Sequence, residues 1–499
     1  MQTNDSALEA LFTLESGKTG VIEEPPFRVL ALGDWSGDGA KVSLSSRKPI
    51  EIDRDNFDEV LSKLRVRLIL DLVGAELELE FGELDDFHPD QIFRRVPLFS
   101  ELRDLRKRLD SEDSFYSAAR EVRERFGIER EVVEHAVVDS ANEPQSDDLL
   151  GAILDKPSGG ASVPKPKPSS ELASLIADLV RPHLVSVDDT ERSEYISAID
   201  EATSGMMRSI IHNRKFQELE AAWRGLYFLV GRTETSTDLK LYVFDVSKDE
   251  LSNALKAGDS LTDTFLYKCM VHETADALTG DPWALSIGNY SFSPNVDDIA
   301  TLMRISKIAA AANAPFISHM RPDVLGIHSL KENADPSTWK LSEDSAAGKL
   351  WSAICDQSES VYLGMTIPRF LVRLPYGIET DPLETFAFEE FLEGPVHDQY
   401  VWSNSAFLAA QVLAASYSQS GWEMGRRLLQ DLDGLPMHVH KEGTEMVFQP
   451  CAEVLLSDRA VDAILNKGLI PLVSYKNSDK VKLAQFQSIA GTALKGRWN

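Results

Sequence analysis

The sequence predicts an α/β protein in which a small α+β N-terminal module precedes a larger mixed α/β module. Two observations carry this prediction. Helix-like and strand-like stretches alternate from residue 190 onward, which is typical of α/β architectures. Residues 156–170 (KPSGGASVPKPKPSS) combine Pro, Gly, Ser and Lys with almost no large apolar side chain, a composition that favours an extended linker. We therefore place the small module at 1–141, a helix plus linker at 142–170 and the large module at 171–499.

The small module begins with a predicted buried strand, because the apolar run Val29 to Leu32 ends at a Gly33-Asp34 turn signal. Asp55 or Asn56 can then cap a helix. The apolar residues at helical spacing in that helix are Phe57, Val60, Leu61 and Leu64. Residues 77, 79 and 81 are apolar and alternate with glutamates, which indicates a half-exposed strand. A helix-rich, charged tail follows to about residue 141.

The large module opens with two predicted helices, at 170–184 and 190–213, and the second carries an apolar stripe that indicates a core-facing side. The elements expected after them are a strand at 239–244, a strand at 284–292 containing a Gly-Asn turn, a helix from 297 that feeds a strand at 315–319, strands or loops at 362–377 and 435–440, and a helix at 404–418.

Composition excludes several classes of protein. The 499 residues carry a net charge of −29, which disfavours nucleic acid and anionic membrane surfaces because both require clustered Lys and Arg. Three widely separated cysteines form neither a disulfide framework nor a zinc motif and fit a reducing cytoplasm. No signal peptide and no apolar run of membrane-spanning length is visible. We therefore expect a cytoplasmic protein without membrane insertion.

No stretch carries a strong catalytic or cofactor motif. Gly17-Lys18-Thr19 is similar to the end of a phosphate-binding loop, but Phe12 stands where that loop needs its first glycine. No nucleophile elbow, dinucleotide-binding fingerprint or EF-hand pattern is present. We predict no catalytic residue, no cofactor and no bound metal, and a soluble α/β enzyme is the remote alternative.

Three weaker patterns have ordinary interpretations. His438 and His440 share one face of a predicted strand, and a metal ion would need Glu442 or Glu445 as a further ligand, so a polar edge strand is the simpler interpretation. The acidic run 389–393 is expected by chance in so acidic a chain. The aromatic residues at the end of a predicted helix pack into a core more often than they bind a ligand; they are Trp223, Tyr227 and Phe228.

Residues 216–251 (FQELEAAWRGLYFLVGRTETSTDLKLYVFDVSKDEL) predict a helix end, a polar turn and an alternating strand, and they resemble the signature of the large sheath subunit of bacterial type VI secretion systems, TssC or VipB. The segments 286–320 and 362–377 follow in the order of that family. Residues 27–37 (FRVLALGDWSG) and 79–109 resemble the small sheath subunit, TssB or VipA. The resemblance implies a small subunit fused to a large subunit whose usual C-terminal region, beyond about Gln487, is shortened.

The resemblance also implies a function. A sheath protomer polymerises around an inner tube and contracts, so the implied partners are other copies of the chain, the inner tube protein Hcp, baseplate components and the AAA+ ATPase ClpV. Residues 146–157 (SDDLLGAILDKP) resemble the helix that ClpV binds, and its apolar face would be Leu149, Leu150, Ile153 and Leu154. A helix docked on its own domain is an equal interpretation of that segment. A sheath-like accessory, cap or adaptor that does not contract is the alternative function.

Overall fold

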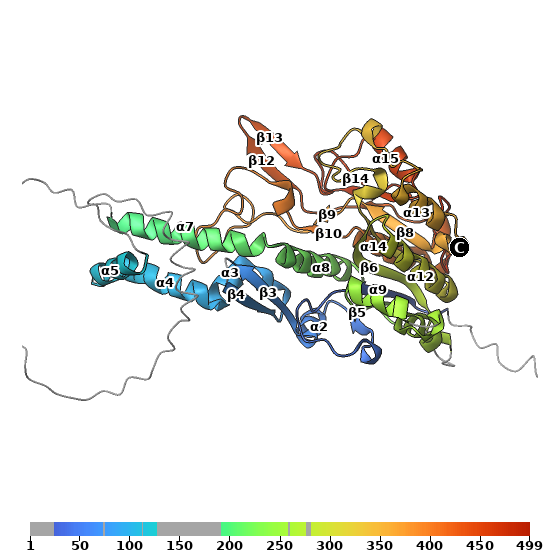
Figure 1. The fold of residues 1–499 in the computed structure, drawn as a ribbon, viewed down its shortest axis with the longest axis horizontal. Coiled ribbons are helices and arrows are strands. Elements are labelled where there is room, and N and C mark those ends of the chain that lie inside the picture. Colours follow the sequence, from blue (N-terminus) through green and yellow to red (C-terminus); the bar gives the residue numbers. More distant parts are fainter. Residues whose placement is uncertain (1–23, 73–74, 112, 127–190, 258–259, 276–280) are drawn as a thin grey trace, which may run out of the picture.

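The computed structural model describes residues 24–72, 75–111, 113–126, 191–257, 260–275 and 281–499. Figure 1 shows a body built around a large sheet and an arm of helices that extends from it. Helices and strands alternate through the body, so the predicted α/β fold class is confirmed. Among the described residues, no helix has both the length and the apolar character needed to cross a lipid bilayer.

The body is organised by a nine-stranded sheet with the order β11-β15-β14-β8-β7-β6-β1-β5-β2. Its strands are β1 (Phe27–Gly33), β2 (Ile50–Ile52), β5 (Leu239–Asp245), β6 (Trp283–Phe292), β7 (Phe316–Met320), β8 (Leu363–Ile367), β11 (Asp431–Leu432), β14 (Ile470–Ser474) and β15 (Val481–Leu483). The strands from β14 to β5 are parallel, whereas β2, β11 and β15 pair antiparallel. Two strands of the predicted small module therefore belong to the sheet of the predicted large module, β1 in its interior and β2 at its edge.

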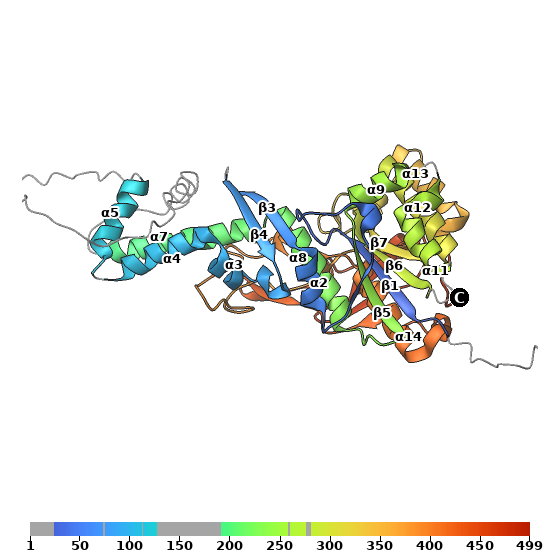
Figure 2. The same ribbon diagram turned by 90° about the horizontal axis from the view of Figure 1, so that it is seen from below.

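Two helical layers cover the sheet, one on each face (Figure 2). One layer contains α9 (Lys248–Ala257), α12 (Val296–Ala312) and α13 (Ala346–Cys355), and the other contains α8 (Arg214–Gly231) and α14 (Ala406–Ser420). Alternate side chains of a strand point to opposite faces. Leu30 and Leu32 of β1 accordingly join the core under α12, whereas Val29 and Ala31 join the core under α14. Both cores therefore include β1.

The arm combines helices from the two predicted modules. α7 (Glu191–Ile211) packs on α4 (Pro97–Asp110), and α5 (Phe115–Phe126) contacts α4 as well. The buried leucines of α4 recur at helical spacing, which gives the helix one apolar stripe; they are Leu98, Leu102, Leu105 and Leu109. Between the arm and the sheet lie α2 (Phe57–Leu64), α3 (Pro89–Arg95) and the hairpin of β3 (Val66–Leu72) and β4 (Ala75–Phe81).

Smaller elements complete the body. They are β9 (Phe370–Leu371) paired with β10 (Trp402–Ser403), the hairpin of β12 (His438–Glu442) and β13 (Glu445–Gln449), α10 (Phe265–Tyr267), a π-helical turn at Lys268–His272, α11 (Glu273–Ala275) and α15 (Asp458–Leu465). The predicted helices at 190–213 and 404–418 correspond to α7 and α14, and the strand predicted at 239–244 is β5. The helix predicted at 170–184 lies outside the described residues.

The turn predicted at Gly288-Asn289 is wrong, because β6 runs through both residues as a strand. Glycine serves close packing at this point. A Cβ atom on Gly288 would lie 2.4 Å from Cζ of Phe316, far inside van der Waals contact. The neighbouring aromatic ring therefore explains the glycine without a change of chain direction.

Candidate functional site

The first candidate site is the joint between the two predicted modules, centred on β1. This strand pairs with β5 from Phe27 opposite Leu239 to Gly33 opposite Asp245, and with β6 on its other side. Every side chain of β1 except that of Arg28 is buried. Backbone groups buried in a core need hydrogen-bond partners. Without β1 the sheet would therefore have two unpaired edges, on β5 and β6, inside the body.

Ion pairs and hydrogen bonds hold the carboxyl end of β1. The Asp245 carboxylate accepts hydrogen bonds from the backbone N–H of Trp35 at 2.8 Å and from the Ser36 hydroxyl at 2.8 Å. Nearby, the Arg47 guanidinium donates two hydrogen bonds to the Glu250 carboxylate, at 2.7 and 3.1 Å. The hydrogen bond from Arg47 lowers the pKa of Glu250 to about 2. In each of these pairs one partner precedes residue 126 and the other follows residue 191.

Aromatic side chains pack across the same joint. Trp35 and Trp223 are both fully buried, and their rings meet edge to face with centroids 5.5 Å apart. The Trp223 indole N–H donates to the Trp35 carbonyl at 3.0 Å. Trp223 is thus a core residue, as predicted. Tyr227 is not, because 49% of it is exposed, although its ring packs edge to face with that of Phe57, with centroids 5.2 Å apart.

A second cluster is a buried ion network beside residues 374–396, a segment between β9 and β10 that we call the strap. Arg373 lies between two carboxylates, with its Nε 2.8 Å from Glu220 of α8 and its Nη1 2.8 Å from Glu390 of the strap. Arg224 also contacts Glu220, at 2.7 Å. Burial alone would raise the pKa of Glu390, but the charge of Arg373 and a hydrogen bond from His212 lower it to about 2. The network therefore holds ionised groups in the core.

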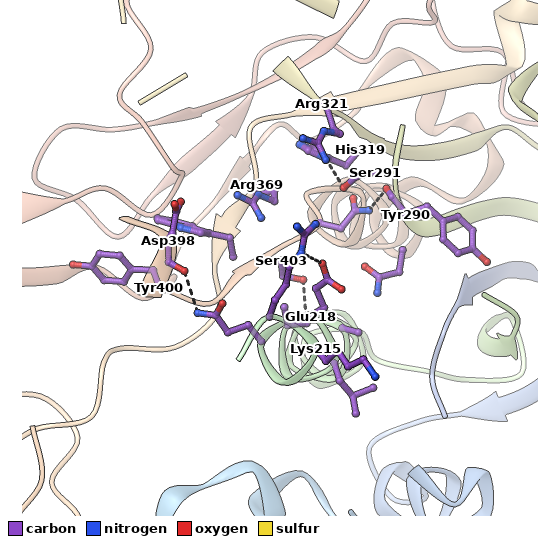
Figure 3. Close-up of a pocket in the computed structure, with 18 of the residues that line it drawn as sticks. Lys215, Glu218, Tyr290, Ser291, His319, Arg321, Arg369, Asp398, Tyr400 and Ser403 are labelled. Atoms are coloured by element: carbon purple, nitrogen blue, oxygen red, sulfur yellow. Dashed lines mark hydrogen bonds and ion pairs between the residues drawn. The ribbon is translucent and has the colours of Figure 1, made fainter. Parts of the chain in front are cut away.

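The third candidate is a cleft of about 1180 Å³ at the carboxyl ends of β1, β6, β7 and β8 (Figure 3). Ser291 and His319 come from the sheet, Arg369 follows β8, and Lys215 of α8 lies on the opposite wall. Strand β1 separates β5 from β6, although these two are consecutive among the described strands of the sheet. Ligands of open α/β sheets bind in such crevices. The position of the cleft alone would suit an enzyme. The chemistry of the residues that line it therefore decides whether the cleft could act as an active site.

The two buried groups of the cleft that could act as a base, His319 and Glu453, are respectively neutral and ion-paired. Ser291 Oγ lies 3.0 Å from His319 Nδ1, and burial lowers the pKa of His319 to about 3. Arg369 contacts Glu453 at 2.6 Å. Burial alone would raise the pKa of Glu453, but Arg369 and a hydrogen bond from His397 hold it well below its usual range. A general base needs a pKa near the working pH. Neither His319 nor Glu453 meets that requirement.

Two known families match the two parts of the chain that meet at β1. The family described as "Type VI secretion system, VipA, VC_A0107 or Hcp2" matches residues 9–126. The family described as VipB, "EvpB/VC_A0108, tail sheath N-terminal domain", matches residues 193–490, which is more than half of the chain. The chain belongs to the type VI secretion sheath family. It combines a VipA-like (TssB-like) part and a VipB-like (TssC-like) part in one polypeptide, as the sequence predicted.

Two individual sheath proteins are similar to this chain. The type VI secretion system sheath protein TssC1 of Pseudomonas aeruginosa is 36% identical over 315 residues, which cover 61% of this chain and 63% of TssC1. The sheath protein TssB1 of the same organism is 28% identical over 151 residues, which cover 28% of this chain and 76% of TssB1. The chain thus spans less than two thirds of the length of its TssC1 relative.

The sheath-family match explains which parts meet at the joint. Strand β1 and the arm helices α4 and α5 belong to the VipA-like part, whereas α7, β5 and β6 belong to the VipB-like part. The contacts that join the two parts therefore include the shared sheet and the helix packing along the arm. The sheath family is a structural family, which agrees with the ion pair of Glu453 and Arg369 and the low pKa of His319 in the cleft.

The predicted site residues lie outside the described part of the chain. They are Leu149, Leu150, Ile153 and Leu154 of the predicted ClpV-binding helix, and the rejected loop pattern at Gly17-Lys18-Thr19 lies outside it as well. His438 and His440 share a face as predicted, with ring centroids 5.3 Å apart. The Tyr400 hydroxyl lies 2.6 Å from the His438 ring, and among the described residues no group of three His, Cys, Asp or Glu side chains is arranged to hold a metal.

Sequence reasoning missed the ion network. Glu390 belongs to the acidic run 389–393, which is expected by chance in so acidic a chain. Only 2% of Glu390 is exposed, however, so this carboxylate is buried. One signal was present in the sequence. Arg373 interrupts the apolar segment around β9, and a charge inside such a segment needs a buried partner. The identity of that partner required the tertiary structure.

Proposed function

We propose that this chain is the structural protomer of a type VI secretion contractile sheath, which polymerises around an inner tube and contracts to drive the tube outward. The observation that supports the proposal best is the position of β1. A strand from the VipA-like part completes the sheet of the VipB-like part, so one chain forms one building block. Helical polymers are built from repeated head-to-tail contacts of such blocks.

The proposed mechanism needs no active site in this chain. Contraction would be a cooperative change from an extended lattice to a better-packed short lattice, and the free energy would come from contacts between subunits. The proposed partners are other copies of the chain, the inner tube protein Hcp and the baseplate. The proposed location is the cytoplasm, and neither nucleic acid binding nor catalysis is part of the function.

Electron microscopy tests this proposal directly. The full chain is expressed with and without the inner tube protein, and negatively stained samples are examined for tubules. Tubules of regular helical pitch are expected. A protein that stays monomeric at high concentration in both samples would contradict the proposal. Binding to tubules of separate sheath subunits, without tubules of its own, would support the accessory, cap or adaptor function instead.

We further propose that residues 146–157 bind a ClpV-type ATPase that disassembles the contracted sheath. The support is the apolar face of this predicted helix, which would insert into a groove of the ATPase. Replacing Leu150 and Ile153 by Asp is expected to abolish binding of the purified ATPase without unfolding the chain. Asp148→Asn, on the polar side, is the matched control. Equal binding of all three proteins would refute this assignment.

A further inference from the structure

The arm leaves the body at a break between two helices. α7 ends at Ile211 and α8 begins at Arg214. Between them, Asn213 is the N-cap of α8 with an extended backbone (φ −64°, ψ 130°), and its side chain accepts a hydrogen bond from the N–H of Lys215. Conformational changes of domains are absorbed by a few residues at the ends of elements. The break at His212-Asn213 is placed to act as such a hinge.

The strap crosses this break and contacts α3, beside the arm, and α7 of the arm. Its Glu384 and Thr385 N–H groups donate to the Asp90 carboxylate of α3, at 3.0 and 3.1 Å, and the Thr385 hydroxyl donates to the same carboxylate at 2.5 Å. Phe386 packs on Phe93 of α3 with ring centroids 4.7 Å apart. Arg208, in the last turn of α7, donates to the Glu389 carbonyl at 3.1 Å.

A single carboxylate connects the strap, the hinge and the body. Glu390 lies 3.3 Å from the Nε2 atom of His212 in the hinge and 2.8 Å from the Arg373 guanidinium of the body. It also accepts the backbone N–H of Tyr376 at 2.8 Å. Arg373 in turn contacts Glu220 of α8, the helix on the other side of the break. Glu390, Arg373 and Glu220 are buried and His212 is partly buried, so their interactions are poorly screened by solvent.

We propose that the strap is a conformational latch in which the Glu390 carboxylate, through His212 and Arg373, fixes the arm at one angle to the body. When this contact opens, the arm turns about the break at His212-Asn213. The proposal concerns the chain itself and is independent of whether the chain polymerises. A connection as long as the strap without helices or strands is unusual in a compact fold. The role as a latch accounts for its length.

Distance measurements between spin labels test the latch. Cysteines replace Lys107 on α4 and Lys349 on α13, two exposed positions on the arm and the body, in a chain whose three native cysteines are replaced by serine. The otherwise unchanged chain is expected to show one narrow distance. Glu390→Gln removes the charge at nearly constant shape and is expected to add a second distance or to widen the distribution.

The matched control is Glu389→Gln, because the exposed side chain of Glu389 accepts only a hydrogen bond from the Ile378 N–H. It is expected to keep the narrow distance. Asp90→Ala releases the other end of the strap and provides a second test if Glu390→Gln fails to fold, as judged by circular dichroism. Narrow distances in both latch variants, or a broad distance in the parent chain, would overturn the proposal. Because the assay uses isolated chains, its failure leaves the sheath function untouched.

Discussion

Replacing Trp35 by Ala is expected to destabilise both halves of the chain together. Trp35 is fully buried at the end of β1, against Trp223 and Phe407 with ring centroids 5.5 and 6.3 Å away. Truncation of a buried tryptophan to alanine costs about 3 to 5 kcal/mol, because apolar burial is lost and a cavity remains. The hydrogen bond from the indole N–H to the Ala31 carbonyl, at 3.3 Å, is lost as well.

The assay is urea unfolding followed by far-UV circular dichroism, with the free energy of unfolding extrapolated to water. Because β1 belongs to both cores, one cooperative transition at a lower urea concentration is expected. Tyr116→Ala is the matched control, since Tyr116 is 84% exposed on α5 and its loss is expected to change the free energy of unfolding by less than about 0.5 kcal/mol.

Two results would refute this reasoning. A loss of less than about 1 kcal/mol for Trp35→Ala would show that the Trp35 contacts contribute little to stability. A transition in which residues 191–499 keep the midpoint of the parent chain, while the VipA-like part unfolds earlier, would show that β1 is dispensable for the large sheet. The second result can be read from hydrogen exchange of β5 and β6, the two strands that pair with β1.

Three further predictions concern two glycines, His319 and residues 156–170. Gly225→Ala is expected to destabilise the fold by about 1 to 3 kcal/mol in urea unfolding, because its Cβ would lie 2.2 Å from Ser403 Oγ, whereas Gly205→Ala, with no atom within 4 Å, is expected to be neutral or stabilising. The pKa of His319 is about 3 in the fold, below its value in the unfolded chain. The unfolded state therefore binds more protons, and the free energy of unfolding falls as the pH drops. His319→Gln is expected to remove about 2 kcal/mol of the decrease in the free energy of unfolding between pH 6.5 and 5. A loss that is identical in the variant would contradict this assignment. Lengthening residues 156–170 with Gly and Ser is expected to leave assembly intact, because loop-closure entropy depends weakly on length, and loss of tubules would show that this segment does more than tether.

Local patterns were sufficient for most of the elements and for the family. The apolar spacing of α2, α7 and α12 and the alternation in β4 and β5 appear directly in the sequence, because each pattern spans only one element. The turn predicted at Gly288 is wrong because the role of this glycine depends on a residue outside its own strand. Its role depends on Phe316, which lies in the adjacent strand and not next to it in sequence.

The sequence by itself determined the α/β class, the order of most elements, and the resemblance of the two ends of the chain to small and large sheath subunits. Only the tertiary structure decided that the two parts share a sheet, with Phe27 opposite Leu239, and that Glu390 is the buried partner of Arg373. For the shared sheet the physical reason is distance along the chain, whereas Arg373 and Glu390 are only 17 residues apart and only packing selects Glu390 among the carboxylates of the run 389–393. Periodicity reports which side of an element is apolar, but strand neighbours and ion partners are chosen by packing across the whole fold, where segments about 200 residues apart compete for the same backbone and charge partners.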